Sequence, residues 1–567
     1  MPRPPVLRLA VTSAVLALLL TAAAGAAPRP TLLVLLVVDQ FRTDYIEQFS
    51  PQWTGGLQRL VGGGAWFRRA AYPYLNTVTC AGHATIATGA VPSVHGMVLN
   101  EWWDRQAQRP LTCTHDERAA VVTSTGASAK PHSSTRLAIP ALADEMRRQF
   151  QPAPRIVSLS MKARSALMMA GQGGGDVVMW FEAGAWTWPA PAPGSPMPAI
   201  AAWLHAHPVE ADRGRVWERS LPAARYLFDD DVTGKQPLKG WDAALPHALG
   251  EGPGFHTRWE HSPFSDEYLA RLAAHAASQL KLGRSGSTDL LAVSFSALDR
   301  IGHKLGPRSH EVQDALVRLD AAIGGLLDHL DREVGKDRYV VALSSDHGVS
   351  HVPEQQQRAG LDAGRMTSAG MAQRVEEALT ASLGPGRYVA KLFYTDLYFV
   401  PGVYDRLRAN PGAMKAAMDA LRRAPGIAKV FRSDELARGL HADDPLARAA
   451  AQGYHPERSG DLIMVPKPNW ILSTAAATHG TAHPYDTVVP VVLSGPGIRQ
   501  GTYLTDATPA DIAPTMASLA GLRLPRATGR VLSEALESSS TAGSARDAAP
   551  AASPDRAGSA GLPSNQP

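Results

Sequence analysis

"TLLVLLVVDQ", residues 31–40, is a run of large apolar side chains that ends in an aspartate and a glutamine. An uninterrupted apolar run of this length is typical of a strand buried on both faces, as in a parallel sheet covered by helices. Further runs of this kind, which we interpret as strands of the same sheet, occupy 155–160, 289–295, 338–348 and 487–495. Amphipathic periodicity predicts helices over 266–280, 310–334 and 509–521. The sequence therefore predicts an α/β fold with a central, mostly parallel sheet flanked by helices.

The composition is that of a globular, enzyme-sized chain. Of its 567 residues, 45% are hydrophobic and 19% are charged, which is enough apolar material for a large core. The formal net charge of +4 falls to about +2 if the first 27 residues, which include Arg3 and Arg8, are removed. This balance predicts no nucleic-acid binding surface.

The first 27 residues have the features of a secretory signal peptide. Two arginines precede an apolar stretch from Leu9 to Leu20, and a small-residue run from Ala22 to Ala27 follows. The alternative is an uncleaved membrane anchor, but the apolar stretch is shorter than the roughly 20 residues that span a bilayer. We therefore expect a secreted, periplasmic protein with no membrane span after cleavage.

Two segments interrupt the alternation of strands and helices. Residues 182–262 are rich in proline and tryptophan and are expected to form a surface excursion near a cleft. Residues 385–440 contain a strand candidate, "AKLFYTDLYFV", and a helix, so a small α/β insertion is expected there. The catalytic domain is predicted to span 28–530, and the tail 535–567, which has few large apolar residues, is expected to be disordered.

The chain contains two cysteines, Cys80 and Cys113. An exported protein resides where disulfides persist, so a bridge between them is one interpretation, and two buried thiols are the other.

Polar residues at the ends of the expected strands are the candidates for chemistry, because ligands of open α/β sheets bind beyond the carboxyl ends of the strands. These candidates are Asp39, Asp299, His303, Asp346, His347, His479 and His483. Each one alone is better explained as a helix cap or a structural histidine. Together they form a set of Asp and His ligands that zinc accepts, with no thiolate cluster to compete.

Several motifs in a fixed order resemble the alkaline phosphatase superfamily, and specifically the PafA-type, phosphate-irrepressible secreted phosphatases with a threonine nucleophile. They are "VVDQFRTDY", "NTVTCAGHATIATGAVPSVHG", "LNEWWD", "SMKARSA", "SALDRIGHKLGP", "LSSDHGV" and "THGTAHPYDTVVPVVLSG". The resemblance extends from about Leu32 to about Leu524.

The resemblance implies two Zn²⁺ sites. One would use Asp299, His303 and His479, where His479 is chosen over His483 because it matches the "THG" of the family. The other would use Asp39, Asp346 and His347, with Thr79 also bound to the metal.

Thr79 stands where the family has its nucleophile, at the start of a helix, although a simple N-cap would explain this position equally well. Cys80 lacks the C-x-P-x-R context of formylglycine sulfatases. The resemblance also implies that Asn100, Lys162 and Arg164 bind the transferred phosphoryl group, whereas a turn cap and a solvated basic pair are the alternatives.

The predicted function is a zinc-dependent hydrolase of small-molecule phosphate monoesters, which acts through a phosphothreonine intermediate and releases inorganic phosphate. Two alternatives remain: a phosphodiesterase or nucleotide pyrophosphatase on the same fold, and a metal-holding protein without activity.

Overall fold

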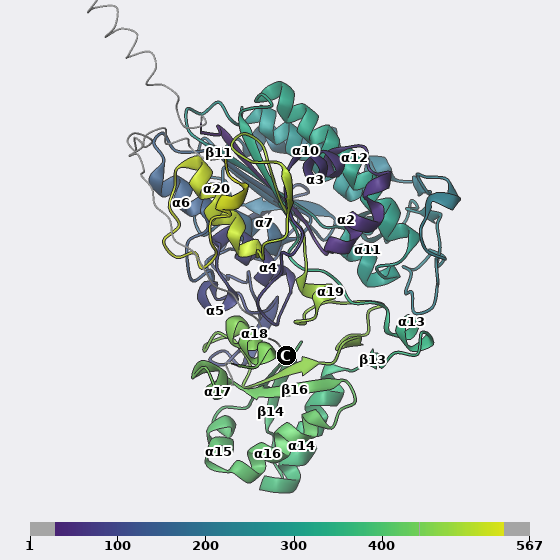
Figure 1. The fold of residues 1–567 in the computed structure, drawn as a ribbon, viewed down its shortest axis with the longest axis vertical. Coiled ribbons are helices and arrows are strands. Elements are labelled where there is room, and N and C mark those ends of the chain that lie inside the picture. The colour runs from purple at the N-terminus through teal and green to yellow at the C-terminus, as the bar shows by residue number, and fades with distance from the viewer. Residues whose placement is uncertain (1–28, 441–442, 538–567) are drawn as a thin grey trace, which may run out of the picture. The chain divides into compact units, whose positions relative to one another are not determined.

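The computed structural model describes residues 29–440 and 443–537 (Figure 1). The predicted signal peptide and all but the first three residues of the predicted tail lie outside this part of the chain. In the described ranges, no helix is long and apolar enough to cross a membrane.

A ten-stranded mixed sheet forms the centre of the fold. In spatial order its strands are β20 (Gly501–Tyr503), β2 (Ala65–Phe67), β19 (Val491–Ser494), β12 (Tyr339–Ser344), β1 (Leu32–Val38), β11 (Asp289–Phe295), β6 (Ile156–Ser160), β7 (Val177–Glu182), β8 (Ala185–Pro189) and β5 (Val121–Thr123). The five strands from β12 to β7 are parallel, and β19 and β8 pair antiparallel at their two sides. The predicted α/β fold with a mostly parallel central sheet is therefore confirmed.

Helices cover both faces of the sheet, as the continuous apolar runs require. Leu32, Val34 and Leu36 of β1 belong to one core cluster, whereas Leu33 and Leu35 belong to another. The first cluster is formed with α2 (Thr43–Phe49), α3 (Gly56–Gly63), α8 (Met197–Ala206), α9 (Phe255–Glu260), α10 (Pro263–Gln279), α11 (Ala297–Leu305) and α12 (His310–Glu333). The second is formed with α4 (Thr79–Thr88), α6 (Leu142–Gln149), α7 (Ala163–Ala170) and α20 (Ile512–Ala520).

A second, four-stranded sheet lies in the C-terminal half of the chain, where an insertion was expected. Its order is β14 (Val389–Phe393), β15 (Asp396–Phe399), β17 (Leu462–Pro466) and β16 (Ile427–Arg432). The helices of this region are α14 (Ser368–Leu383), α15 (Val403–Ala409), α16 (Pro411–Arg422), α17 (Ser433–Ala437) and α18 (Pro445–Gly453). Together these elements, residues 368–466, are called the small lobe. The segment 390–400, predicted as one strand, is a hairpin that turns at Tyr394, whose φ is 48°.

The segment 182–262 is more deeply packed than a surface excursion. It supplies β8 to the main sheet, and its tryptophans Trp186, Trp217 and Trp259 are buried in the core. Large aromatic side chains contribute most when they are removed from water, which explains why this proline-rich segment packs inward. The remaining short elements are α5 (Pro92–His95), α13 (Pro353–Arg358), α19 (Pro484–Thr487), β3 (Glu101–Asp104), β4 (Arg109–Thr112), β9 (Val216–Trp217), β10 (His247–Ala248), β13 (Gly364–Arg365) and β18 (Trp470–Ile471).

Candidate functional site

Three neighbouring parallel strands deliver acidic side chains to one edge of the main sheet. Asp39 follows β1, Asp299 lies in the first turn of α11 after β11, and Asp346 follows β12. In the register, Val37 of β1 lies between Ser294 of β11 and Ser344 of β12, so the three strands end at the same level. Parallel pairing therefore brings together carboxylates that are far apart in the sequence.

Histidines complete two clusters around these acids. One cluster consists of Asp39, Asp346 and His347, and the other of Asp299, His347 and His479. Within each cluster the potential ligand atoms lie within 4.8 Å of one another. The rings of His347 and His479 stack with centroids 3.4 Å apart. His303, one turn after Asp299, places its Nε2 3.2 Å from Oδ1 of that residue. The structure thus gathers all six Asp and His residues expected to bind metal, and His347 belongs to both clusters.

The histidines are oriented by main-chain carbonyls. The Nδ1 atoms of His303, His347 and His479 lie 2.8, 3.0 and 2.8 Å from the carbonyl oxygens of Ala477, Gly348 and Thr77. An Nδ1–H that donates to a carbonyl leaves the Nε2 lone pair for a metal, as in most protein metal sites. His483 differs, because its Nε2 lies 2.9 Å from the carbonyl oxygen of Pro466 and is in neither cluster.

The charges and the unsatisfied atoms of the clusters fit divalent cations. Burial, together with the charges of Asp299 and Asp346, raises the pKa of Asp39 well above its usual value. Oδ1 of Asp39 and Oδ2 of Asp346 are buried and accept no hydrogen bond from the described residues. Buried carboxylate oxygens without hydrogen bonds are costly, and two dications would supply both the charge and the ligand bonds.

Lys162 contributes positive charge between the two clusters. Its Nζ lies 2.5 Å from Oδ2 of Asp39 and 2.6 Å from Oδ2 of Asp299. Burial lowers the pKa values of His347 and His479, which keeps these imidazoles neutral, as metal ligands must be.

Thr79 is the first residue of α4, a helix that is buried along its whole length. Its Oγ1 lies 3.4 Å from Nε2 of His347, so the hydroxyl is adjacent to both clusters. The partial positive charge of the helix N-terminus favours an anion here. The helix approaches closely because residue 82 is glycine: a Cβ at that position would lie 2.1 Å from the carbonyl oxygen of Asp346.

Asn100 is held by its main chain and by two contacts of its side-chain amide. Its main-chain carbonyl accepts a hydrogen bond of 2.9 Å from the N–H of Cys113, and its Oδ1 accepts one of 2.8 Å from the main-chain N–H of Cys80. Its Nδ2 donates to the hydroxyl of Tyr394 over 3.3 Å.

Cys80 and Cys113 form a disulfide, which confirms the bridge that was one of the two interpretations of these cysteines.

A cleft of about 750 Å³ opens beside the clusters. Asn100, Lys162 and Arg164 line it together with Asp299 and His303. The Nε of Arg164 is buried and has no hydrogen-bond partner among the described residues. An arginine with an unsatisfied N–H, placed beside a cluster of potential metal ligands, is suited to bind an oxyanion.

Sequence reasoning missed three residues of this site. Gln40 donates from Nε2 to Oδ1 of Asp299 at 2.7 Å and adopts a φ of 70°, unusual for a residue other than glycine. Nδ1 of His83 lies 3.3 Å from Oδ2 of Asp346. The signal for His83 was its position one helical turn after Thr79. Tyr394 lies 294 residues beyond Asn100, its hydrogen-bond partner, and the sequence gave no signal for it.

Comparison with known proteins finds one matching family and several similar alkaline phosphatases. The model of the type I phosphodiesterase / nucleotide pyrophosphatase family matches residues 33–486. Alkaline phosphatase PhoK of Sphingomonas sp is 31% identical over 88% of this chain and 90% of its own length. Alkaline phosphatase PafA of Elizabethkingia meningoseptica is 27% identical over 90% of this chain and 95% of its own.

A solved structure of PafA superposes with a TM-score of 0.82 at 27% identity, covering 90% of this chain and 100% of that one. A PafA variant, T79S, N100A, K162A, R164A, has the same TM-score at 26% identity, with coverage of 90% and 100%. The chain therefore belongs to the type I phosphodiesterase / nucleotide pyrophosphatase family, and within it to the PafA-like alkaline phosphatases.

Proposed function

We propose that this chain is a secreted, zinc-dependent phosphate monoester hydrolase that acts through a phosphothreonine intermediate on Thr79. The observation that carries the proposal is the composition of one cleft. Lys162, Asn100 and Arg164, whose Nε has no hydrogen-bond partner among the described residues, adjoin the two Asp/His clusters. Cations and amide donors grouped in this way suit a dianionic phosphoryl group.

Asp299, His303 and His479 would hold one Zn²⁺, and Asp39, Asp346 and His347 the other. Bound there, the two ions would lower the pKa of the Thr79 hydroxyl and of water, and would neutralise charge on the leaving oxygen. Nitrogen and carboxylate donors of this kind suit zinc better than magnesium, which prefers octahedral oxygen sites.

The residues of the chain have distinct roles in this proposal. The Thr79 oxygen attacks phosphorus in line with the leaving oxygen, and the N-terminus of α4 stabilises its alkoxide. The Asn100 amide donates to a phosphoryl oxygen, while Arg164 and Lys162 bind the remaining anionic oxygens. Water then cleaves the phosphothreonine and releases inorganic phosphate. Since the transition state is loose, positioning and electrostatics account for most of the rate.

Two cations favour a monoester over a diester. A monoester approaches a charge of −2 above its second pKa of about 6, whereas a diester carries one negative charge and a second organic group. The PafA variant with T79S, N100A, K162A and R164A supports these assignments, because the same residue types stand at the same numbers in this chain.

The test compares kcat/KM for an aryl phosphate and for its methyl diester. The double variant Lys162→Ala, Arg164→Ala is expected to lose far more monoesterase than diesterase activity. Lys130→Ala is the matched control, since it removes an exposed cation from the same cleft without a contact to either cluster. Equal losses of both activities would show that the pair does not select monoesters.

The phosphodiesterase alternative draws support from the description of the matching family. It would take precedence if the wild-type protein hydrolysed the diester with the higher kcat/KM. A protein that binds zinc but hydrolyses neither the monoester nor the diester would contradict both. Thr79→Ala is expected to abolish hydrolysis and Thr79→Ser to retain part of it, because serine keeps the attacking hydroxyl.

We also propose that residues 1–27 are removed as a signal peptide and that the catalytic domain spans 28–530. The Cys80–Cys113 disulfide supports an oxidising compartment. Mass spectrometry of the mature protein, purified from the periplasm, would identify its first residue and so test the cleavage and the start of the domain.

A further inference from the structure

The cleft beside the Asp/His clusters is larger than a phosphoryl group requires. Its volume is about 750 Å³, within the range of roughly 300–1,000 Å³ that encloses a whole small molecule. Asn100, Lys162 and Arg164, the residues proposed to bind the phosphoryl group, account for only part of its lining. We call a further part of the lining the second wall. It consists of Thr114, Lys130, His132, Glu182 and His261.

The second wall joins two segments of the chain. Glu182, the last residue of β7, and His261, which follows α9, lie near the two ends of the segment 182–262. The other residues of the wall lie between β4 and β5. Nδ1 of His132 lies 2.9 Å from Oγ1 of Thr114, and its Nε2 lies 3.3 Å from Oε2 of Glu182. His132 therefore connects the two segments at the cleft.

Glu182 presents a free carboxylate oxygen. Its Oε2 accepts a hydrogen bond of 3.3 Å from Nε1 of Trp180 and also lies next to His132. Its Oε1 accepts none from the described residues, and the side chain is 29% exposed. The contact with His132 lowers the pKa of Glu182, so the carboxylate is ionised at neutral pH. Oε1 is therefore available to a hydrogen-bond donor in the cleft.

His261 presents a second acceptor. Its Nδ1 lies 2.7 Å from the carbonyl oxygen of Thr257, so this nitrogen carries the proton of the neutral ring. Burial lowers the pKa of His261 to about 4, which keeps the imidazole neutral above that pH. Its Nε2 has no hydrogen-bond partner among the described residues. A neutral ring in this tautomer accepts a hydrogen bond at Nε2 and donates none there.

The charges around the two acceptors are balanced. His132 and Lys130 both lower the pKa of Glu182, so its negative charge is offset within the wall. Arg300, another cation of the cleft lining, is paired with Glu260 at 2.7 Å. A second anion on the substrate would be repelled by Glu182, and an ammonium group by Lys130. Two acceptors in balanced surroundings therefore suit uncharged donors, namely hydroxyl groups.

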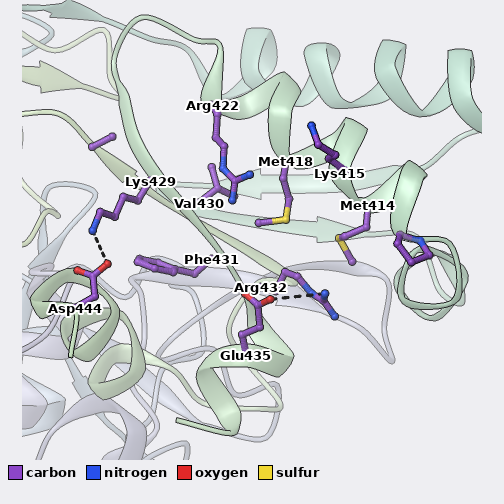
Figure 2. A pocket seen from close by; sticks show the side chains of 12 residues that line it. Met414, Lys415, Met418, Arg422, Lys429, Val430, Phe431, Arg432, Glu435 and Asp444 are labelled. Atoms are coloured by element: carbon purple, nitrogen blue, oxygen red, sulfur yellow. Dashed lines mark hydrogen bonds and ion pairs between the residues drawn. The ribbon is translucent and has the colours of Figure 1, made fainter. Parts of the chain in front are cut away.

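A groove beside β16 in the small lobe provides a contrast (Figure 2). Its cations face acids of the chain itself. Lys429 pairs with Asp444, and Arg432 lies 3.7 Å from Glu435. Charged groups that the protein already pairs do not call for a ligand, whereas the two acceptors of the second wall have no partner among the described residues.

We propose that the second wall binds the alcohol part of the substrate and selects phosphate monoesters of polyhydroxylated alcohols such as sugars. The inference rests on the proposed function, because it requires the phosphoryl group to occupy the same cleft. Glu182 and His261 are then the specificity-determining residues, since one hydroxyl donates to Oε1 of Glu182 and another to Nε2 of His261. An ester without these hydroxyls leaves both acceptors unpaired in the complex, which is how a hydrogen-bonding site discriminates.

The test measures kcat and KM for a hexose 6-phosphate and for cyclohexylmethyl phosphate, which has a ring of the same size without hydroxyls. Each variant is compared with the wild type on the same ester, so the intrinsic reactivity of the ester cancels. His261→Phe keeps a ring and removes the Nε2 acceptor. It should lower kcat/KM for the hexose phosphate about fivefold, mainly through KM, and leave that for the cyclohexylmethyl ester unchanged. His261→Gln restores an acceptor and should recover part of the loss.

Glu182 is tested by two replacements. Glu182→Leu removes both oxygens and should lower kcat/KM for the hexose phosphate about tenfold, because hydrogen bonds to charged groups are the stronger ones. Glu182→Gln keeps an oxygen acceptor and should lose less. If Glu182→Gln instead lost activity mainly on 2-aminoethyl phosphate, the wall would bind ammonium groups, and the proposal would be overturned.

His207→Phe is the matched control. The Nδ1 of His207 lies 2.9 Å from the carbonyl oxygen of Trp203, four residues earlier, in the same arrangement as at His261. His207 does not line the cleft, so this variant should behave as the wild type does with both esters. Equal losses on both esters in His261→Phe, or no loss on either, would contradict the assigned role.

Failure of the proposed function would give a different result. The wild type would then hydrolyse neither ester, and calorimetry would give the Kd of each ester for the same variants. A rise in Kd of about fivefold for the hexose phosphate alone in His261→Phe would support the second wall, whereas equal changes for the two esters would exclude it. Unchanged inhibition by inorganic phosphate would verify that the phosphoryl end of the cleft is intact in each variant.

Discussion

Replacement of Gly82 by alanine tests whether the packing of α4 sets the position of Thr79, the proposed nucleophile. A Cβ at residue 82 would lie 2.1 Å from the carbonyl oxygen of Asp346 and 2.7 Å from its Cα. Both neighbours are main chain, so no side-chain rotation relieves the contact. An ordinary separation needs about 3.4 Å, and α4 must therefore retreat from the strand end by about 1 Å.

The expected magnitude follows from this displacement. Thr79 is three residues before Gly82 on the same helix, and its hydroxyl lies 3.4 Å from Nε2 of His347. A misplacement of about 1 Å can cost about a hundredfold in rate, so we expect kcat to fall by about that factor. Overpacking should also destabilise the fold by about 1–3 kcal/mol.

The assay measures phosphate release, zinc content and urea unfolding for Gly82→Ala and for Gly325→Ala. Gly325 lies within α12, and a Cβ there would meet nothing within 4 Å. This control should keep its activity and gain up to about 1 kcal/mol of helix stability. A folded, zinc-replete Gly82→Ala protein with near-wild-type kcat would refute the reasoning, because catalysis would then tolerate a shifted α4.

Three further predictions concern other contacts of the site. Burial raises the pKa of Asp266, which accepts the N–H groups at the start of α11, to about 7; the folded chain then keeps a proton that the unfolded chain releases above about pH 4. Between pH 4 and pH 7 the free energy of unfolding of the wild type should therefore fall by up to about 4 kcal/mol relative to that of Asp266→Asn. Urea unfolding that gave the same difference between the two proteins at every pH would contradict this. Tyr394→Phe removes the hydroxyl that accepts from Asn100 and should lower kcat/KM for an aryl phosphate about tenfold with zinc content unchanged, whereas equal kinetics would exclude a positioning role. Cys113→Ala opens the bridge to Cys80 and should cost about 3–4 kcal/mol for a separation of 33 residues; a reductant should destabilise the wild type but not the variant.

The central strands were predictable because burial on both faces leaves a continuous apolar run. β11 was predicted with the bounds that it has, 289–295, and β1 and β6 within a residue or two. The edge strands β5 and β20 have three residues each and leave no comparable run. The hairpin β14–β15 was read as one strand because its turn contains neither glycine nor proline; Tyr394 takes the left-handed conformation instead.

The residues of the two Asp/His clusters were accessible to sequence reasoning because they lie at strand ends in recognisable motifs. Gln40 was not, since a glutamine at a strand end is an ordinary turn residue until its contacts are seen. The Gln40 side chain packs directly against Gly302 of α11, where a Cβ would lie 1.9 Å from the Gln40 amide oxygen. The glycine on α11 thus makes room for the side chain that joins Asp299 to the end of β1.

Each of the two sheets supplies a different part of the site. The main sheet supplies the Asp/His clusters through the ends of β1, β11 and β12, which are rigidly registered with one another. The small sheet supplies the β14–β15 turn, where Tyr394 contacts Asn100 and Thr395 donates to the side-chain oxygen of Asn76, three residues before Thr79. Changes in the small lobe should therefore alter the binding and orientation of the phosphoryl group while leaving metal affinity unchanged. Variation in this lobe is accordingly a way to change substrate preference without disturbing the ligands that the main sheet holds.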